Sequence, residues 1–164
     1  MATDWIEEAP LLRGLDDAAK ASLREAAIRK NIPRGAVLFR PGDQCVNFPI
    51  IVSGTVRVQR VTESGREIVL YRVSTNETCI LTTASLLSED AYSAEGVAET
   101  DVTVQIVPAE RFAALMNASA SFRALVFDGY SQRIATLMSR IEEIVCTRIN
   151  VRLAERLLAL RGAD

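Results

Sequence analysis

The 164-residue chain contains no histidine. Histidine is the usual general base of enzymes and the commonest metal ligand among side chains. A Ser–His or Cys–His nucleophile pair is therefore impossible. A small β-barrel enzyme that holds iron, zinc or copper through clustered histidines is disfavoured for the same reason. The sequence predicts that this protein is not an enzyme and holds no catalytic metal.

Cysteine and long apolar runs are also scarce. Three cysteines, an odd number, stand at positions 45, 79 and 146, which is not the pattern of a disulfide framework. No run approaches the roughly 20 apolar residues that span a bilayer. The acidic start "MATDWIEEAP" has no apolar segment of the kind that signal peptides carry. We expect a cytoplasmic protein with reduced thiols and no membrane partner.

Positive charge is missing from one long stretch. No lysine or arginine lies between Arg72 and Arg111, and the formal net charge of the whole chain is −2. A nucleic-acid-binding module usually carries a basic face, so these 164 residues are not expected to bind DNA by themselves. With 49% hydrophobic and 24% charged residues, the chain has an ordinary globular composition and can bury a sizeable core.

Helical periodicity marks the first part of the chain and short strands mark the middle. Residues 15–30, "LDDAAKASLREAAIRK", begin with acids and end with bases, as the helix dipole favours, and carry an apolar stripe at helical spacing. Between residues 36 and 107, short β-type runs alternate with turn signals, which are Pro41–Gly42, Ser53–Gly54 and Thr62–Gly65. This series predicts a jelly-roll or sandwich.

The last third is predicted to be helical again, beginning at Pro108. Six apolar residues follow at alternating spacings of three and four, which predicts a coiled-coil seam between two chains: Phe127, Tyr130, Ile134, Leu137, Ile141 and Ile144. The alternative is that the helix packs on its own barrel. Phe122, Leu125, Val126 and Met138 could make that contact alongside the seam. A second short helix is expected after Cys146, with Asn150 as its N-cap.

Four segments in this order resemble the Crp/Fnr family of bacterial transcription regulators. "PRGAVLFRPGD" and "FPIIVSGTVRV" are similar to the first strands and turns of the family, and "SGREIVLYRV" to the hairpin before its effector cassette. "VCTRINVRLAERLLAL" is similar to the end of the dimer helix where it runs into the DNA-binding domain. The resemblance covers essentially the whole chain.

This resemblance implies an α+β fold, a double-stranded β-helix or jelly-roll like that of cyclic-nucleotide-binding domains, with N-terminal helices and a long C-terminal dimerisation helix. We expect the sensor roll in residues 1–117, the dimerisation helix in residues 118–147, and the start of a winged helix-turn-helix domain in residues 148–164. The rest of that domain is expected to be missing, so that DNA is bound only through it. The implied function is effector sensing in a homodimeric regulator. A nucleotide-regulated domain of a kinase or channel is the alternative.

The segment Asn76–Thr100 corresponds to the family's phosphate cassette. Members that bind cyclic AMP carry a Gly-Glu start, an inner Glu for the ribose and an Arg-Ser-Ala close, whose Arg neutralises the phosphate. This chain has Asn76–Glu77 at the start, Leu81 or Thr82 near the inner Glu position, and Tyr92-Ser93-Ala94 at the close. A desolvated phosphate without a cation costs several kcal/mol, so cyclic AMP binding is not expected unless Arg57, Arg66 or Arg72 substitutes.

An uncharged lining of hydroxyl groups suits a neutral small-molecule effector, or a packed pocket that binds nothing. The candidate pocket residues are Cys79, Thr82, Thr83, Ser85, Tyr92 and Ser93. A thiol or redox switch through Cys79 or Cys146 is an alternative, although Cys79 lies in an apolar run and is expected to be buried and inert. Three cysteines cannot supply the four cysteine ligands of an iron–sulfur cluster in one chain, and the histidine that the family's haem sensors use is absent.

Overall fold

The computed structural model describes the backbone of residues 4–161 and the side chains of residues 4–146, 151 and 153. It divides into two compact units, Met1–Tyr130 and Ser131–Asp164. The first unit holds all the described strands, and the second consists mainly of the helix α5 (Ala120–Arg161). Among the described helices, none is long and apolar enough to cross a membrane.

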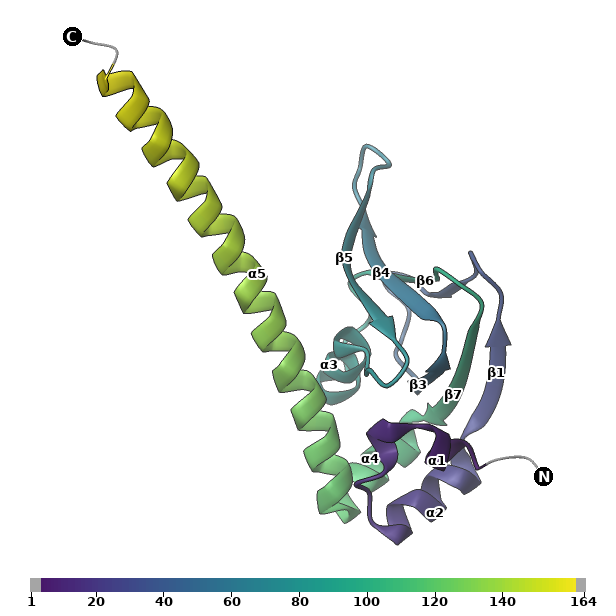
Figure 1. Cartoon of the computed structure of the whole chain (residues 1–164). Helices are drawn as coiled ribbons and strands as arrows, with labels where there is room; N and C mark the ends of the chain where they lie inside the picture. Colours follow the sequence, from purple (N-terminus) through teal and green to yellow (C-terminus); the bar gives the residue numbers. More distant parts are fainter. Residues whose placement is uncertain (1–3, 162–164) are drawn as a thin grey trace. The chain divides into compact units, whose positions relative to one another are not determined.

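The strands of the first unit form two antiparallel sheets, which confirms the jelly-roll (Figure 1). One has the order β1-β7-β3 and consists of Ile28–Ile32, Val102–Pro108 and Asn47–Ser53. The other has the order β2-β6-β4-β5 and consists of Val37–Phe39, Glu95–Ala98, Thr55–Val61 and Glu67–Ser74. Side chains that alternate along the strands fill the space between the sheets, among them Ile51, Val58, Val73 and Val104.

The predicted turns lie where the sequence places them. The Asp43 N–H donates to the Arg40 carbonyl at 3.1 Å across Pro41–Gly42. Gly42 has a φ of +90° there, a conformation that glycine adopts without strain. Residues 62–65 close the β4–β5 hairpin, where the Thr62 N–H donates to the Arg66 carbonyl at 2.9 Å.

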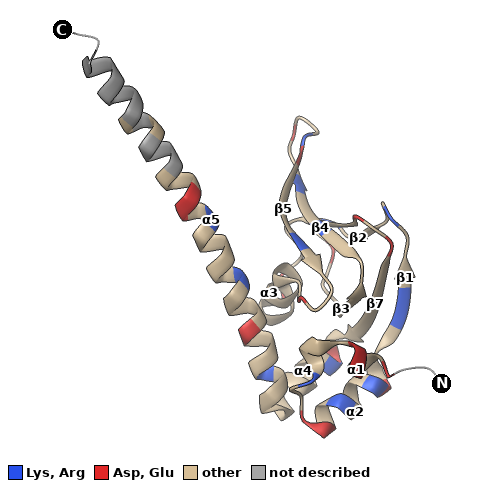
Figure 2. Ribbon diagram, in the orientation of Figure 1, with Lys and Arg blue, Asp and Glu red and all other residues tan. Residues whose placement is uncertain are grey.

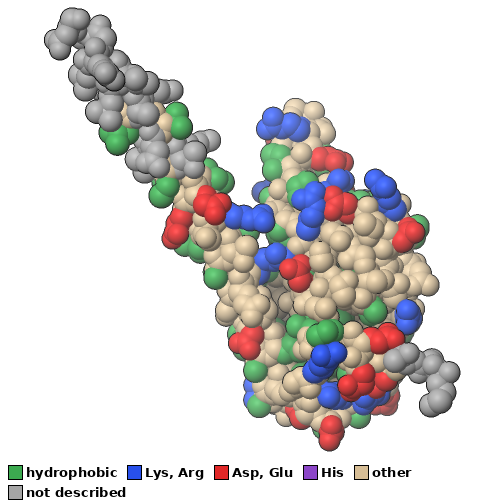
Figure 3. All heavy atoms as spheres, viewed as in Figure 1, with side chains coloured by type: hydrophobic (Ala, Val, Ile, Leu, Met, Phe, Trp, Pro, Cys, Tyr) green, Lys and Arg blue, Asp and Glu red, His purple; other side chains and the backbone are tan. Residues whose placement is uncertain are grey.

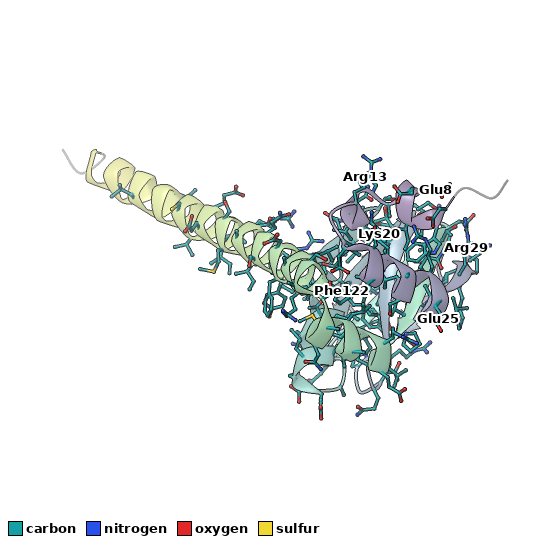
Figure 4. All side chains as sticks on the ribbon, turned by 90° about the horizontal axis from the view of Figure 1, so that it is seen from below. Glu8, Arg13, Lys20, Glu25, Arg29 and Phe122 are labelled. Atoms are coloured by element: carbon teal, nitrogen blue, oxygen red, sulfur yellow. The ribbon has the colours of Figure 1, made fainter. Side chains whose placement is uncertain are left out.

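Helices cover the other face of the three-stranded sheet (Figure 1). They are α1 (Trp5–Glu8), the short 3-10 helix η1 (Pro10–Leu12), α2 (Asp17–Ala26), α4 (Ala109–Ala118) and the first turns of α5. Three phenylalanines anchor this layer: the rings of Phe48 and Phe112 lie 4.9 Å apart, and Phe122 meets both edge-on. Phe122 lies at the junction between α5 and the helical layer (Figure 4).

The start of α5 is also tied to α2. The hydroxyl of Ser121 donates to the Asp16 carboxylate at 2.6 Å, and Ser119 donates to the same carboxylate. These bonds, with the Ala19 N–H that Asp16 caps, lower the pKa of Asp16 to about 2. Phe122 and Val126 are buried against the helical layer and Leu125 is half-buried, as predicted, whereas Met138 is 54% exposed.

The helix predicted for residues 15–30 is too long. The helix α2 ends at Ala26, and Ala27 is already extended, with φ −76° and ψ 135°. From Ile28 the chain pairs with β7 in an unbroken register from Ile28↔Ile106 to Ile32↔Val102. Pairing with a distant strand therefore overrides the local helical pattern of residues 28–30.

The break predicted near Asn150 is also wrong, because α5 continues from Ala120 to Arg161 without interruption. Neither proline nor glycine occurs between residues 130 and 161, so no residue there forces a helix to end. Asn150 lies within this helix rather than at an N-cap. The boundary expected between the dimerisation helix, residues 118–147, and the start of the next domain, residues 148–164, stays a prediction.

Candidate functional site

The segment expected as a loop folds around the short helix α3 (Ile80–Ser88). After β5, Asn76 adopts a φ of +67°, and the Glu77 carboxylate accepts a hydrogen bond from the Ser74 N–H at 2.8 Å. Cys79 occupies the N-cap position, but its side chain forms no capping bond. The first N–H groups of α3 are therefore left to be satisfied by other parts of the protein.

A tyrosine hydroxyl occupies the N-terminal end of α3. Tyr71 and Val73 alternate on the buried face of β5, and the Tyr71 hydroxyl accepts a hydrogen bond from the Leu81 N–H at 3.1 Å. The same hydroxyl lies 3.7 Å from the Cys79 sulfur. Backbone N–H groups at a helix start are a common anion site, and here a neutral side chain of the protein itself takes that place.

Removing this hydroxyl should have a measurable cost. We expect Tyr71→Phe to lower the free energy of unfolding by about 1–2 kcal/mol, because the half-buried Leu81 N–H loses its acceptor. Urea denaturation at one protein concentration measures it. Tyr92→Phe is the control and should cost less, since its partners are side chains that can reorient. Equal stability of Tyr71→Phe and the unaltered protein would contradict this role.

A second tyrosine, Tyr92, fills the interior beside α3. Its ring stacks on Phe39 with centroids 4.1 Å apart and planes 11° apart. Its hydroxyl lies 3.2 Å from the Thr82 hydroxyl and 3.0 Å from the Cys45 thiol. Burial, with the Cys45 contact as a smaller cause, raises the pKa of Tyr92 far above its usual range. Tyr92 therefore stays neutral and offers no charge to a bound anion.

The arginines considered as substitutes do not reach this interior. Val56, Val58, Tyr71 and Val73 point inward from β4 and β5, so Arg57 and Arg72, which alternate with them, lie on the outer face. Arg72 is paired with Glu99 through two contacts of 2.6 and 2.8 Å, and Arg57 with Glu67 at 3.3 Å. Figure 2 shows basic positions on β4 and β5 but none on α3.

The remaining substitute, Arg66, lies at the β4–β5 hairpin turn and is exposed. Among the residues whose side chains the structure describes, no lysine or arginine is buried. A phosphate placed at the start of α3 would therefore be desolvated without a positive partner.

The structure brings together three of the six predicted pocket residues. The hydroxyls of Thr82 and Tyr92 lie 3.2 Å apart, and Cys79 belongs to the same buried cluster as Tyr92. The Thr83 hydroxyl is buried but donates to the Cys79 carbonyl of its own helix at 3.0 Å. Ser85 lines a different cavity, of about 560 Å³, between α3 and α4. Ser93 is exposed.

Sequence analysis missed Tyr71, Phe39 and Cys45 as members of this cluster. The alternation of Tyr71 with Val73 along β5 was a signal that could have placed Tyr71 on the inner face. No local signal pairs Phe39 with Tyr92, because they are 53 positions apart in the sequence and meet only in the folded roll.

The cysteines are not arranged as activated thiols. Cys79 is buried, as expected, and Cys45 is half-buried, where burial raises the pKa of its thiol. Cys146 is exposed within the continuous helix α5 and not at a hinge.

Within the described residues, no group of three or more acidic or cysteine side chains lies close enough to hold a metal ion.

The seam residues of α5 leave apolar surface uncovered. Phe127, Ile134, Ile141 and Ile144 are 41–57% exposed, while Tyr130 and Leu137 are half-buried. Hydrophobic side chains are visible at the surface of this helix in Figure 3. A repeated apolar stripe of this kind on one helix is typical of a surface that packs against a partner helix.

The first turns of α5 come very close to the segment that precedes α3. A Cβ atom built on Gly129 would lie 2.7 Å from the Thr78 hydroxyl oxygen. Only a residue without a side chain leaves room for this approach. The segment just before α3 and the first turns of α5 therefore lie side by side at Thr78 and Gly129.

Comparison with known proteins identifies the family of this chain. Residues 29–119 match the family model described as the cyclic nucleotide-binding domain. The global nitrogen regulator of Synechococcus elongatus is 31% identical over 131 residues, which is 77% of this chain and 57% of the regulator. The chain thus spans little more than half the length of that relative.

Solved structures give the same fold. A protein from Eubacterium rectale assigned to the Crp/Fnr transcriptional regulators superposes with a TM-score of 0.72 and 25% identity, covering 84% of this chain and 64% of that one. The sensor domain of the transcriptional regulator DNR from Pseudomonas aeruginosa superposes with a TM-score of 0.63 at 18% identity, covering 79% of this chain and 90% of that domain. The second likeness shows the fold alone.

Proposed function

The chain belongs to the cyclic nucleotide-binding domain family, and we propose that it is the effector-sensing and dimerisation part of a Crp/Fnr-type transcription regulator that does not respond to cyclic AMP. The similarity to the nitrogen regulator and to the Eubacterium rectale protein supports the regulatory role. The proposal assigns DNA contact to a part of the regulator outside these 164 residues, whose net charge is −2.

The observation that carries the proposal is the Tyr71 hydroxyl on the Leu81 N–H. In the cyclic AMP-binding relatives that the sequence resembles, the helix start cradles the phosphate and an arginine neutralises it. Here Tyr71 occupies the helix start, and Tyr92 stands where the arginine would be. Both the anion site and its counter-charge are replaced by neutral aromatic side chains that pack in the core.

We expect a calorimetric titration of the purified chain with cyclic AMP to show no binding tighter than about 1 mM. A dissociation constant of 1 mM corresponds to only about 4 kcal/mol of binding free energy, and desolvating an unpaired phosphate removes several kcal/mol. A cyclic AMP-binding member of the family, titrated in the same buffer, is the positive control. Micromolar binding would contradict the proposal.

The variant Tyr92→Arg separates two causes of weak cyclic AMP binding, the missing positive charge and the occupied start of α3. It places a guanidinium where the family has one and removes the Phe39–Tyr92 stack. New heat with cyclic AMP would assign the loss of binding to the missing charge. If the folded variant still shows no heat of cyclic AMP binding, the loss of binding would be assigned to Tyr71, whose hydroxyl still occupies the start of α3.

We also propose a homodimer held by the α5 seam. The seam spans Phe127 to Ile144 at coiled-coil spacing, and four of its six residues are more than 40% exposed in the single chain. The Thr78–Gly129 approach supports a route from the effector site to the dimer, since a change in the segment just before α3 meets the first turns of α5 directly. An effector that prefers one arrangement of α3 would then shift the population of α5 arrangements.

A further inference from the structure

A second cavity lies at the open side of the roll. β1 is an end strand of the three-stranded sheet and β2 an end strand of the four-stranded sheet. A cavity of about 340 Å³ is lined by residues of both strands, by β7 and by the segment 43–47. This volume lies within the range of small-molecule pockets. Among the described residues, none of α3 contributes to the lining, so the cavity is separate from the start of that helix.

The walls of this cavity are mainly apolar. Ile32, Val37, Val104 and Ile106 come from strands of the two sheets. The stacked pair of Phe39 and Tyr92 also lines it and is more than 90% buried. Such a surface can bind an alkyl chain or an aromatic ring, because binding removes the apolar surface of both the ligand and the cavity from water.

Lys30 is the one cation among the described residues that line the cavity. Lys30 pairs with Val104 across β1 and β7, which places it on the inner side of the edge strand, and it is exposed. Within the part of the chain that the structure describes, no carboxylate lies at ion-pair distance from its ammonium group. An ammonium group beside an apolar cavity is suited to the head group of an organic anion.

The one carboxylate in the lining is already engaged. Asp43 accepts a hydrogen bond from the Arg40 N–H at 2.8 Å and so closes its own turn. The other polar lining residues are Gln44 and Asn47, whose side-chain amides can donate to an anion. An anionic head group can meet the Lys30 ammonium group and these amide donors, whereas a cationic head group has only the Asp43 carboxylate as a charged partner among the described lining residues.

We propose that this cavity binds a small amphipathic carboxylate, with the carboxylate against Lys30 and its apolar part across Ile32, Val104 and the Phe39–Tyr92 stack. This site goes beyond the proposed function, because binding here requires neither a change at the start of α3 nor a dimer. Tyr92 nevertheless contacts both places, through its ring at the cavity and its hydroxyl at Thr82.

The test is a calorimetric titration of the 164-residue chain with sodium octanoate at pH 7, below its micelle concentration. We expect saturable binding with one site per chain. 1-Octanol and octylamine, which keep the chain length and change the head group, should bind at least tenfold more weakly. General attraction of anions is not the cause of such a difference, since the protein itself is acidic.

Variants assign the site. Lys30→Met should weaken octanoate binding at least tenfold. Arg29→Met, its neighbour on the same strand, should change binding less than twofold, because Arg29 pairs with Gln105 and adjacent residues of a strand point to opposite faces. Ile32→Trp should abolish binding by filling the cavity, with the melting temperature as the check on folding.

Several outcomes would overturn the proposal. The first is no saturable octanoate binding in either calorimetry or ligand-observed NMR. Equal binding of octanol would remove the role of charge, and tighter binding of octylamine would assign the head-group site to Asp43. Undiminished binding to a folded Ile32→Trp or Lys30→Met variant would place the octanoate elsewhere.

Discussion

Replacing Ile134 and Leu137 with aspartate is expected to convert a dimer into monomers. The two positions are adjacent members of the predicted seam, and in a parallel pair each meets its counterpart on the partner helix. The double variant would therefore place four carboxylates within an apolar interface, where unpaired charges cost several kcal/mol. We expect the dimer dissociation constant to rise at least a hundredfold, about 2.8 kcal/mol.

Light scattering across a range of protein concentrations measures this change, since the mass falls from two chains to one. The matched control is Gln132→Asp with Ser139→Asp, which adds the same two charges to the same helix away from the seam. That control should remain dimeric. A seam variant that stays dimeric at every concentration would refute the coiled-coil assignment.

Adding a single methyl group at Gly54 is expected to destabilise the roll by about 2–5 kcal/mol. Two independent costs combine at this bend between β3 and β4. Gly54 has a φ of +91°, which costs a residue with a side chain about 1–2 kcal/mol. Its added Cβ would also lie 2.2 Å from the Asp101 carbonyl oxygen, so the backbone must shift, at a cost of about 1–3 kcal/mol.

Gly42→Ala separates the two costs. Gly42 has nearly the same φ, +90°, but a Cβ built there meets no atom within 4 Å. It should lose only the conformational part, about 1–2 kcal/mol. Urea denaturation of both variants at one protein concentration, so that any association affects each equally, gives the difference. An equal loss in the free energy of unfolding for Gly54→Ala and Gly42→Ala would show that the segment around Asp101 moves to make room for the Cβ without a cost in free energy.

The sequence alone indicated the order of parts and most turns. Pro41–Gly42, Ser53–Gly54 and Thr62–Gly65 punctuate the roll where the structure has its turns. Such turns depend on backbone conformations that a few residue types favour, so their signal is local and survives in the sequence. The apolar stripe of residues 15–23 is likewise buried as its spacing predicts.

Local sequence patterns predicted the wrong structure at two places. In one, pairing with a distant strand determined the structure; in the other, the absence of a helix-breaking residue did. Residues 28–30 continue a helical pattern but form β1, because β7 offers a strand to pair with. At Asn150 the side chain suits an N-cap, yet α5 continues, since capping preference does not end a helix that nothing interrupts. Neither result is readable from a short window of sequence.

The candidate site shows the same division. The sequence determined that no cation occurs between Arg72 and Arg111, and its resemblance to the family implies that Tyr92 stands at the place of the family's arginine. Only the tertiary structure decided what fills the space: Tyr71 reaches the Leu81 N–H from β5, and Phe39 stacks on Tyr92 from β2. It also decided that Arg57 and Arg72 face outward. Composition and order fix which groups are available, whereas strand pairing and register fix which of them meet.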